Sequence, residues 1–199
     1  MAKDTKERIL MTALDMFSKK GYEGTNIREL AASLGLVKSS IYKHYESKEA
    51  IWNALLDRMI AYYREHFGSA EHLPPVPDSL EDFISMTMRM VNLTIHDEQI
   101  VRTRKVLTLE QFRSPEMGRL YQQYLVSGPV GYMADLFAAQ NMPRPKELAV
   151  RFYAQMFLLY SVYDGTGNKK AALALMDDLL DRTAEQLAAE KKRGKKNGK

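Results

Sequence analysis

A short stretch of basic, hydroxyl and aromatic side chains near the N-terminus has the chemistry to bind a polyanion. It runs from Lys38 to Lys43 and holds two lysines, two serines and a tyrosine around one isoleucine. Lysine ammonium groups pair with phosphate oxygens, and hydroxyl groups donate to phosphates or to base edges. No acidic residue lies between Glu29 and Glu46, so nothing within the stretch repels phosphate. The stretch therefore predicts contact with a nucleic acid.

Two short helical patterns joined by a glycine would position these side chains. The first pattern can be capped by Thr25 or Asn26 and has apolar residues at helical spacing: Ile27, Leu30, Ala31 and Leu34. Gly35 permits a sharp turn before the second pattern, which buries Ile41 and Tyr45. A helix, a glycine turn and a second helix within about 20 residues form a helix-turn-helix, and the major groove of DNA admits one such helix.

Helical spacing recurs along the rest of the chain, and no segment alternates apolar and polar residues as a strand would. The pattern predicts an all-α protein of about nine helices, the second helix of the pair running from Lys38 to His44. Glycines and prolines separate the helices, with breaks expected at Gly21, at Gly128-Pro129 and before Pro145. Capping residues mark further helix starts at Asp4, Ser47, Ser79, Asp97, Ser114 and Asn168.

Basic charge is concentrated at the two ends of the chain. The formal net charge is +4, and the last nine residues alone hold six of the 29 basic residues. Residues 1–48 hold nine basic and six acidic residues, whereas residues 49–190 are net acidic. A basic N-terminal module on an acidic body is typical of a protein that meets nucleic acid at one end.

Several classes of protein are disfavoured by what the sequence lacks. The absence of cysteine excludes disulfides, thiolate metal sites and cysteine nucleophiles. No apolar run approaches the roughly 20 residues that span a bilayer, and the N-terminus lacks the pattern of a signal peptide. No phosphate-binding loop, metal-ligand spacing or nucleophile motif is present. We therefore expect a cytoplasmic protein that is not an enzyme and needs no metal or cofactor.

The helix-turn-helix stretch resembles the tetracycline-repressor (TetR) type of bacterial regulators. The resemblance is carried by residues 25–49, TNIRELAASLGLVKSSIYKHYESKE, and by the preceding FSKKGY segment at 17–22. It covers about the first 60 residues. Beyond them the chain is similar to the family only in length, helical content and segment spacing.

The resemblance implies which residues contact DNA. Thr25 would cap its helix and help to hold a phosphate, Lys38 and Ser40 would approach base edges or backbone, and Lys48 would hold another phosphate. The full set is Thr25, Lys38, Ser39, Ser40, Tyr42, Lys43, His44 and Lys48. The sequence departs from the family at Val37, where a capping serine or threonine is common, and at Ser39, where glycine is common. The predicted recognition helix therefore lacks its side-chain cap.

The resemblance also implies a domain organisation. Residues 1–48 would form the DNA-binding domain and residues 49–190 a helical domain for ligand binding and dimerisation. A helix from 47 to 67 would connect the two, and residues 191–199 would form a disordered basic tail.

The C-terminal helices carry more apolar surface than one protomer of this length can cover, which predicts a homodimer. The interface candidates are Phe152, Met156, Leu159, Tyr163, Met176, Leu179, Leu180 and Thr183. In the family the central helices enclose a ligand pocket. Its candidates here are Met86, Met90, Phe112, Tyr121, Tyr124, Met133, Phe137, Tyr153 and Met156, each of which could equally be an ordinary core residue.

Taken together, these features predict a ligand-responsive transcriptional regulator. It would bind a palindromic double-stranded DNA operator as a homodimer, act as a repressor, and be released by a small molecule that prefers another orientation of its DNA-binding modules. The alternatives are a helical adaptor that binds protein, a small-molecule-binding protein without a role on DNA, and an enzyme built in a helical bundle.

Overall fold

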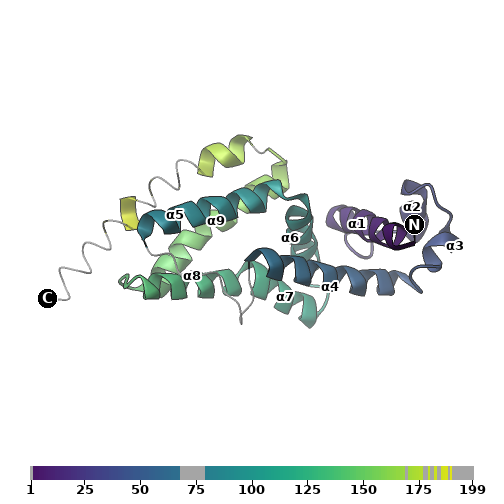
Figure 1. The fold of residues 1–199 in the computed structure, drawn as a ribbon, viewed down its shortest axis with the longest axis horizontal. Helices are drawn as coiled ribbons and strands as arrows, with labels where there is room; N and C mark the ends of the chain where they lie inside the picture. The colour runs from purple at the N-terminus through teal and green to yellow at the C-terminus, as the bar shows by residue number, and fades with distance from the viewer. Residues whose placement is uncertain are drawn as a thin grey trace. The chain divides into compact units, whose positions relative to one another are not determined.

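The computed structural model describes residues 2–67, 79–168 and 170–176, together with 179, 182, 185–187 and 189. These residues are helical apart from the turns that join the helices, and no strand occurs among them, which confirms the expected all-α fold. Figure 1 shows the helices: α1 (Ala2–Lys20), α2 (Ile27–Ser33), α3 (Lys38–Tyr42), α4 (Lys48–Phe67), α5 (Leu80–His96), α6 (Glu98–Glu110), α7 (Pro115–Leu125), α8 (Ser127–Ala139) and α9 (Pro145–Thr166). Further helical residues follow within 170–189. Within these stretches, no helix has the length and apolar character required to cross a membrane.

The chain folds into two compact units. The N-terminal unit comprises Met1–Pro74 and Arg102–Gly118, and the C-terminal unit comprises Pro75–Val101 and Arg119–Lys199. Helix α6 therefore begins in the C-terminal unit and ends in the N-terminal unit, and α7 returns. These units differ from the expected domains at 1–48 and 49–190, because residues 49–74 and 102–118 belong to the N-terminal unit. The division of DNA-binding and ligand-binding roles between the expected domains remains a prediction.

Most of the expected helix boundaries agree with the structure. Gly21 ends α1 with a φ of 69°, and its amide donates to the Phe17 carbonyl at 2.9 Å. Ser47 caps α4, since its hydroxyl accepts from the Ala50 amide at 3.0 Å. One expectation was wrong: α1 begins at Ala2, so Asp4 lies in its first turn instead of capping it.

The core of the N-terminal unit is built from one face each of α1, α2, α3 and α4. Its fully buried members include Ile9, Leu14, Phe17, Leu30, Ile41, Ile51 and Leu55. An aromatic cluster adjoins it, in which the Phe17 and Trp52 rings meet edge to face with centroids 5.1 Å apart. Burial of each large apolar side chain contributes on the order of 1.5–3 kcal/mol, so this core fixes the short helices α2 and α3.

The core of the C-terminal unit is built mainly by α5, α8 and α9. The ring of Phe83 lies 5.2 Å from that of Phe137 and 5.7 Å from that of Phe152, centroid to centroid. Three of its expected helix caps are present: Ser79 accepts from the Asp82 amide, Asp97 from the Ile100 amide and Asn168 from the Ala171 amide. The break expected at Gly128-Pro129 lies slightly earlier, because α7 ends at Leu125 and α8 begins at Ser127.

Candidate nucleic-acid interface

The turn between α2 and α3 has the geometry that the glycine predicted. Gly35 has a φ of 69°, in the left-handed region where a side chain is strained. The Gly35 amide donates to the Ala32 carbonyl at 3.0 Å, and the Leu36 amide to the Ala31 carbonyl at 2.8 Å. These bonds close the end of α2 and direct the chain into α3.

Helix α3 presents one apolar face to the core and a polar face to solvent. Ile41 is fully buried and Tyr45, just beyond the helix, is 5% exposed. The outward residues fall into two groups: Lys38, Ser39, Tyr42 and Lys43 are exposed, and Ser40 and His44 are half-buried. The structure thus places a row of donors on one surface, as the sequence predicted.

The ends of α3 show one confirmed expectation and one correction. Val37 occupies the N-cap position with no side-chain hydrogen bond, as its apolar side chain predicted. The helix ends at Tyr42 rather than at His44, because the amides of His44 and Tyr45 both donate to the carbonyl of Ile41. Lys43 is the C-cap, so it and His44 lie at the exit of the helix.

The two tyrosines near α3 have different environments. The Tyr42 ring is 41% exposed and has the ammonium of Lys38 5.4 Å from its centroid. The Tyr45 ring is buried, with Lys6 Nζ 5.1 Å from its centroid and its hydroxyl 3.5 Å from the Lys6 carbonyl. Burial raises the pKa of the Tyr45 hydroxyl, and Glu7 adds to the rise. Tyr45 is therefore a core residue, and Tyr42 is available to a partner.

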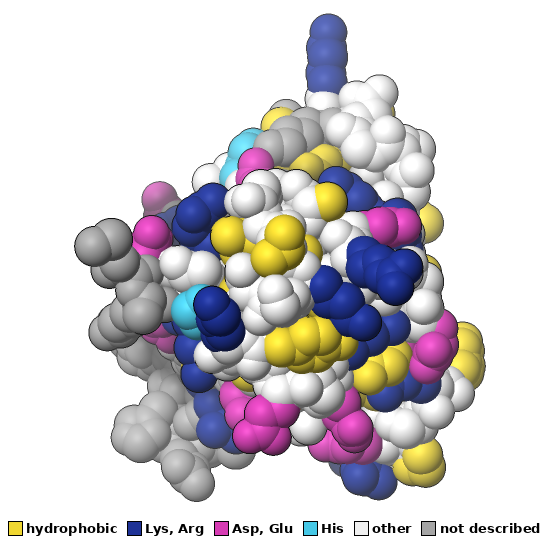
Figure 2. Space-filling view, turned by 90° about the vertical axis from the view of Figure 1, so that its right-hand side faces the viewer, with side chains coloured by type: hydrophobic (Ala, Val, Ile, Leu, Met, Phe, Trp, Pro, Cys, Tyr) yellow, Lys and Arg dark blue, Asp and Glu magenta, His cyan; other side chains and the backbone are white. Residues whose placement is uncertain are grey.

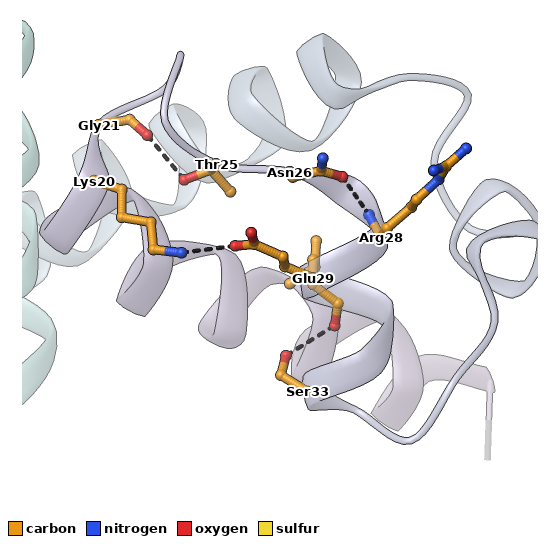
Figure 3. A network of polar contacts seen from close by, with 8 residues as sticks. Lys20, Gly21, Thr25, Asn26, Arg28, Glu29 and Ser33 are labelled. Atoms are coloured by element: carbon orange, nitrogen blue, oxygen red, sulfur yellow. Dashed lines mark hydrogen bonds and ion pairs between the residues drawn. The ribbon is translucent and has the colours of Figure 1, made fainter.

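Thr25 does not have the environment expected of it. Its side chain is only 2% exposed, and its hydroxyl donates to the Gly21 carbonyl at 2.8 Å (Figure 3). The cap of α2 is Asn26, whose side-chain oxygen accepts from the Arg28 amide at 2.8 Å. The capping role predicted for Thr25 was wrong, since its hydroxyl stabilises the turn between α1 and α2 instead. A phosphate contact by Thr25 would need that hydroxyl to leave the Gly21 carbonyl.

An ion pair braces α1 against α2. Lys20 Nζ lies 2.7 Å from Glu29 Oε2, while the nearby Arg28 side chain extends away from this network (Figure 3). Both members of the pair are about half exposed, so the pair stabilises the fold by about 0–1 kcal/mol. Arg28 is an exposed cation that the sequence interpretation did not select, although its position next to the Asn26 cap was visible in the sequence.

Lys48, the first residue of α4, is held against an aromatic ring. Its Nζ lies 4.2 Å from the centroid of the Tyr22 ring, at the distance of a cation–π contact. Arg113, just after α6, lies on the same ring, with its Cζ 4.0 Å from the centroid. Burial raises the pKa of the Tyr22 hydroxyl, and the positive charge of Arg113 opposes this rise.

Glu110, the last residue of α6, anchors this cluster. Its carboxylate is buried and accepts from the Tyr22 amide at 2.8 Å, while its other oxygen lies 3.5 Å from the Arg113 guanidinium. A second contact joins α6 to α1, because Arg102 Nε lies 3.3 Å from Asp15 Oδ1. The sequence did not indicate these contacts, since no local pattern links α6 to α1.

Figure 2 views the molecule from the side on which α1, α2 and α3 lie in Figure 1. Lys and Arg side chains are interleaved with hydrophobic ones across the middle of this face, and acidic side chains lie around its margins, with the largest groups toward the bottom. Basic and apolar side chains together suit a polyanionic partner whose phosphates and base edges lie close to each other.

The ligand-pocket candidates lie in different places. Phe137 and Met156 belong to the buried core of the C-terminal unit, and Met86, Met133 and Tyr153 pack against that core. The remaining members of this unit are half-buried: Met90, Tyr121 and Tyr124. Phe112 belongs to the N-terminal unit and is 90% exposed.

Three polar side chains in the C-terminal unit were not selected from the sequence. The Tyr132 hydroxyl is buried without a hydrogen-bond partner in the described part of the chain, and burial raises its pKa. The Thr94 hydroxyl donates to the Tyr160 hydroxyl at 3.1 Å. A buried hydroxyl without a partner is unusual in proteins and is a position that a bound polar group can satisfy.

The dimer-interface candidates on α9 lie on its inner face. Phe152, Met156, Leu159 and Tyr163 are all buried within the protomer, and Met176 is buried as well. The opposite face of α9 is exposed and apolar: Val150, Ala154, Phe157 and Leu158. Helix α9 is thus apolar on both faces, as the sequence predicted, but the residues that were chosen lie on the face that the protomer itself covers. Leu179 is half-buried, whereas Leu180, Thr183 and the basic tail at 191–199 lie outside the described residues.

No group of three or more His, Asp or Glu side chains that could hold a metal ion occurs in the described ranges. The outward polar side chains on and just after α3 are lysines, hydroxyls and one imidazole, which are suited to hydrogen bonding and charge pairing.

The N-terminal residues match a known family. Residues 9–55 match the tetR family of bacterial regulatory proteins. Among curated proteins, the chain is similar to IcaR of Staphylococcus epidermidis, a negative transcriptional regulator of the biofilm operon, with 27% identity over 48% of this chain and 67% of the relative. Other curated relatives match over 24% of this chain and only 17% or 25% of their own length.

Solved structures show the same fold over most of the chain. A tetR-family transcriptional regulator from Agrobacterium tumefaciens superposes with a TM-score of 0.65 at 16% identity, covering 92% of this chain and 98% of the other. The structure of AibR with isovaleryl coenzyme A and operator DNA superposes with a TM-score of 0.59 at 19% identity, covering 92% and 97%. These superpositions support the fold of this chain.

Proposed function

We propose that this chain, whose residues 9–55 match the tetR family of bacterial regulatory proteins, is a transcriptional repressor that binds operator DNA. The observation that carries the proposal is the two-faced α3, where Ile41 is fully buried beneath an outward row of lysine, serine and tyrosine side chains. The relatives named above are regulators, and none is named as an enzyme. Such a repressor acts in the cytoplasm, where bacterial DNA lies.

Within the proposal, the outward residues divide by position. Lys38, Ser39 and Ser40 open α3 and would reach base edges, since the first residues of a recognition helix enter the major groove. The others would contact phosphates on either side of the groove: Tyr42, Lys43, His44 and Lys48. Thr25 contributes through the turn that its hydroxyl stabilises.

A homodimer follows from the exposed face of α9. Phe157 and Leu158 are 37% and 55% exposed, and Val150 is 54% exposed on the same helix. Exposed Glu147 and Arg151 lie on the same side of α9, so its apolar part is a limited patch of the kind that a partner covers. A second copy of the chain provides an identical face, and the two-fold pair reads the two halves of a palindrome.

The ligand-binding role is proposed for the C-terminal unit. Its support is three hydroxyl groups. The Tyr132 hydroxyl is buried with no hydrogen-bond partner in the described residues, and the Thr94 and Tyr160 hydroxyls are hydrogen-bonded to each other. The side chains of Tyr132 and Tyr160 pack against the apolar core of this unit. A neighbour with this fold has been solved with both an acyl-coenzyme A and operator DNA bound, so the fold can hold both kinds of partner. A ligand releases DNA only in so far as it binds the DNA-free state more tightly.

Selection of bound duplexes from a random DNA library tests the proposal. We expect the wild-type chain to enrich one palindrome and the Lys38→Ala/Tyr42→Ala variant to lose that enrichment. Lys19→Ala is the matched control, because it removes a lysine charge from α1 where Lys19 pairs with Asp15 at 2.7 Å. A folded wild-type dimer that enriches no duplex would contradict the proposal and would favour the adaptor alternative.

A further inference from the structure

In chain order the segment from Arg102 to Gly118 is an excursion, because it belongs to the N-terminal unit whereas the residues just before and after it belong to the C-terminal unit. It holds most of α6, the turn after it and the start of α7. The end of α6 is therefore part of the same compact unit as α1 to α4.

The excursion is fixed to α1 and to the following turn by three kinds of contact. Near the start, Arg102 Nε lies 3.3 Å from Asp15 Oδ1. At the end, the buried Glu110 carboxylate accepts from the Tyr22 amide at 2.8 Å. Beyond it, Arg113 stacks on Tyr22 and lies 5.0 Å from the ring of Trp52. All of these contacts lie within the N-terminal unit.

Tyr22 connects this anchor to a proposed phosphate contact. Its ring bears Arg113 at 4.0 Å and Lys48 at 4.2 Å from the centroid, so two cations share one π system. A cation–π contact fixes the long, flexible lysine side chain, which otherwise samples many rotamers. Glu110 determines where the ring lies by holding the Tyr22 amide, and its second oxygen faces Arg113.

We propose that Glu110 and Arg113 are positioning residues for DNA binding, which act through the Tyr22 ring to hold the Lys48 ammonium in place for a phosphate. The inference rests on the proposed DNA-binding function and assigns to it residues that touch no DNA themselves.

A double-mutant cycle between Arg113 and Lys48 tests this inference. The probe is the duplex that the wild-type chain enriches from a random library, with affinity measured over a range of salt concentrations. Each phosphate contact contributes about 0.9 to the slope of log affinity against log salt. Because the proposed dimer holds two copies of each residue, we expect Lys48→Ala and Arg113→Ala each to reduce the slope by about 1.8, and the double variant to reduce it no further. A double variant with twice the reduction would overturn the proposal, since the two cations would then act independently.

Conservative variants and a fluorescence readout separate positioning from folding. Trp52 is the only tryptophan of the chain, and it adjoins Arg113, so its emission reports the cluster directly. Arg113→Lys keeps a cation on the ring and should restore the salt slope, whereas Arg113→Gln should not. Helicity and the thermal midpoint should match the wild type in both. Equal loss of slope in Arg113→Lys and Arg113→Gln would contradict a role through the ring.

The same experiment distinguishes failure of this inference from failure of the proposed function. If the folded wild-type chain binds no duplex at all, DNA binding itself is wrong and the inference falls with it. If the wild type binds and Lys48→Ala reduces the slope while Arg113→Ala leaves it unchanged, the repressor proposal stands and the positioning role is overturned.

Discussion

The carboxylate of Glu110 accepts a hydrogen bond from the backbone amide of Tyr22 at 2.8 Å, across 88 positions of sequence. The contact is close enough to constrain the neighbouring residue, because a Cβ added at Gly21 would lie 2.7 Å from Glu110 Oε1. Gly21 therefore has two reasons to be glycine, its φ of 69° and the approach of this carboxylate.

A second glycine with the same left-handed backbone, Gly35, allows these reasons to be separated. Gly21 and Gly35 share a φ of 69°, but a Cβ at Gly35 would meet nothing within 4 Å. Gly35→Ala should therefore lower the free energy of unfolding by about 1–2 kcal/mol, because of the left-handed conformation alone. Gly21→Ala should lower it by about 1–3 kcal/mol more than Gly35→Ala does, since the Glu110 carboxylate must give up its hydrogen bond. Denaturant unfolding followed by Trp52 fluorescence measures both.

The excess should disappear when the carboxylate is absent. In a Glu110→Ala background, Gly21→Ala and Gly35→Ala should lower the free energy of unfolding by the same amount within error. If the excess persists in that background, something other than the Glu110 carboxylate opposes a side chain at position 21.

Tyr42 and Tyr45 should respond oppositely to truncation. Tyr45 is 5% exposed, and Tyr45→Ala should lower the free energy of unfolding by about 3–5 kcal/mol, as for other buried aromatic side chains. Tyr42 is 41% exposed, and Tyr42→Ala should change stability by no more than about 0.5 kcal/mol. A gel-shift titration should show weaker DNA binding for Tyr42→Ala. Loss of stability without loss of DNA affinity at Tyr42 would place it in the core instead.

Local sequence was sufficient to predict the helix-turn-helix, because each of its determinants acts over a few residues. Gly35 fixes the turn, Ile41 and Tyr45 alternate with polar residues at helical spacing, and Ser47 caps α4. Even there, the sequence could not decide between Thr25 and Asn26 as the cap. The choice depends on the Gly21 carbonyl, which the Thr25 hydroxyl reaches only in the folded turn.

Contacts between distant segments could not be predicted from the sequence. Nothing in the local pattern of Glu110 or Arg113 distinguishes a helix end that packs on α1 from one that faces water. For α9, the pattern showed that both faces are apolar but not which face the protomer covers. Leu158 and Leu159 are neighbours of identical type, yet Leu158 is 55% exposed and Leu159 is fully buried.

The hydroxyl of Tyr132 should reduce stability in the absence of ligand. It is buried with no hydrogen-bond partner in the described residues, so Tyr132→Phe should raise the free energy of unfolding by about 1–3 kcal/mol. The measurement is denaturant unfolding without ligand. An unchanged or lower stability would indicate that water or another group already satisfies the hydroxyl.

The same hydroxyl should affect stability in alkaline solution. Burial raises its pKa above the ordinary value of 10.0, so the folded chain retains a proton that the unfolded chain releases. The contribution of this hydroxyl's protonation to the free energy of unfolding is therefore fully present below pH 10, and it is lost as the pH rises through the raised pKa. Tyr132→Phe should make this fall less steep, and an identical pH profile for both proteins would contradict the assignment.

The exposed face of α9 should decide the oligomeric state. Leu158 is 55% exposed on that face, and a charge there would have to be buried between two copies. Leu158→Glu should therefore shift the chain toward monomer in sedimentation analysis while its helicity stays unchanged. Leu109→Glu is the matched control, because Leu109 is 52% exposed and lies on α6, outside the proposed interface. Because two-fold pairing presents both recognition helices, Leu158→Glu should also weaken binding to a palindromic duplex more than to a half-site. A dimer that survives Leu158→Glu would exclude this face of α9 as the interface.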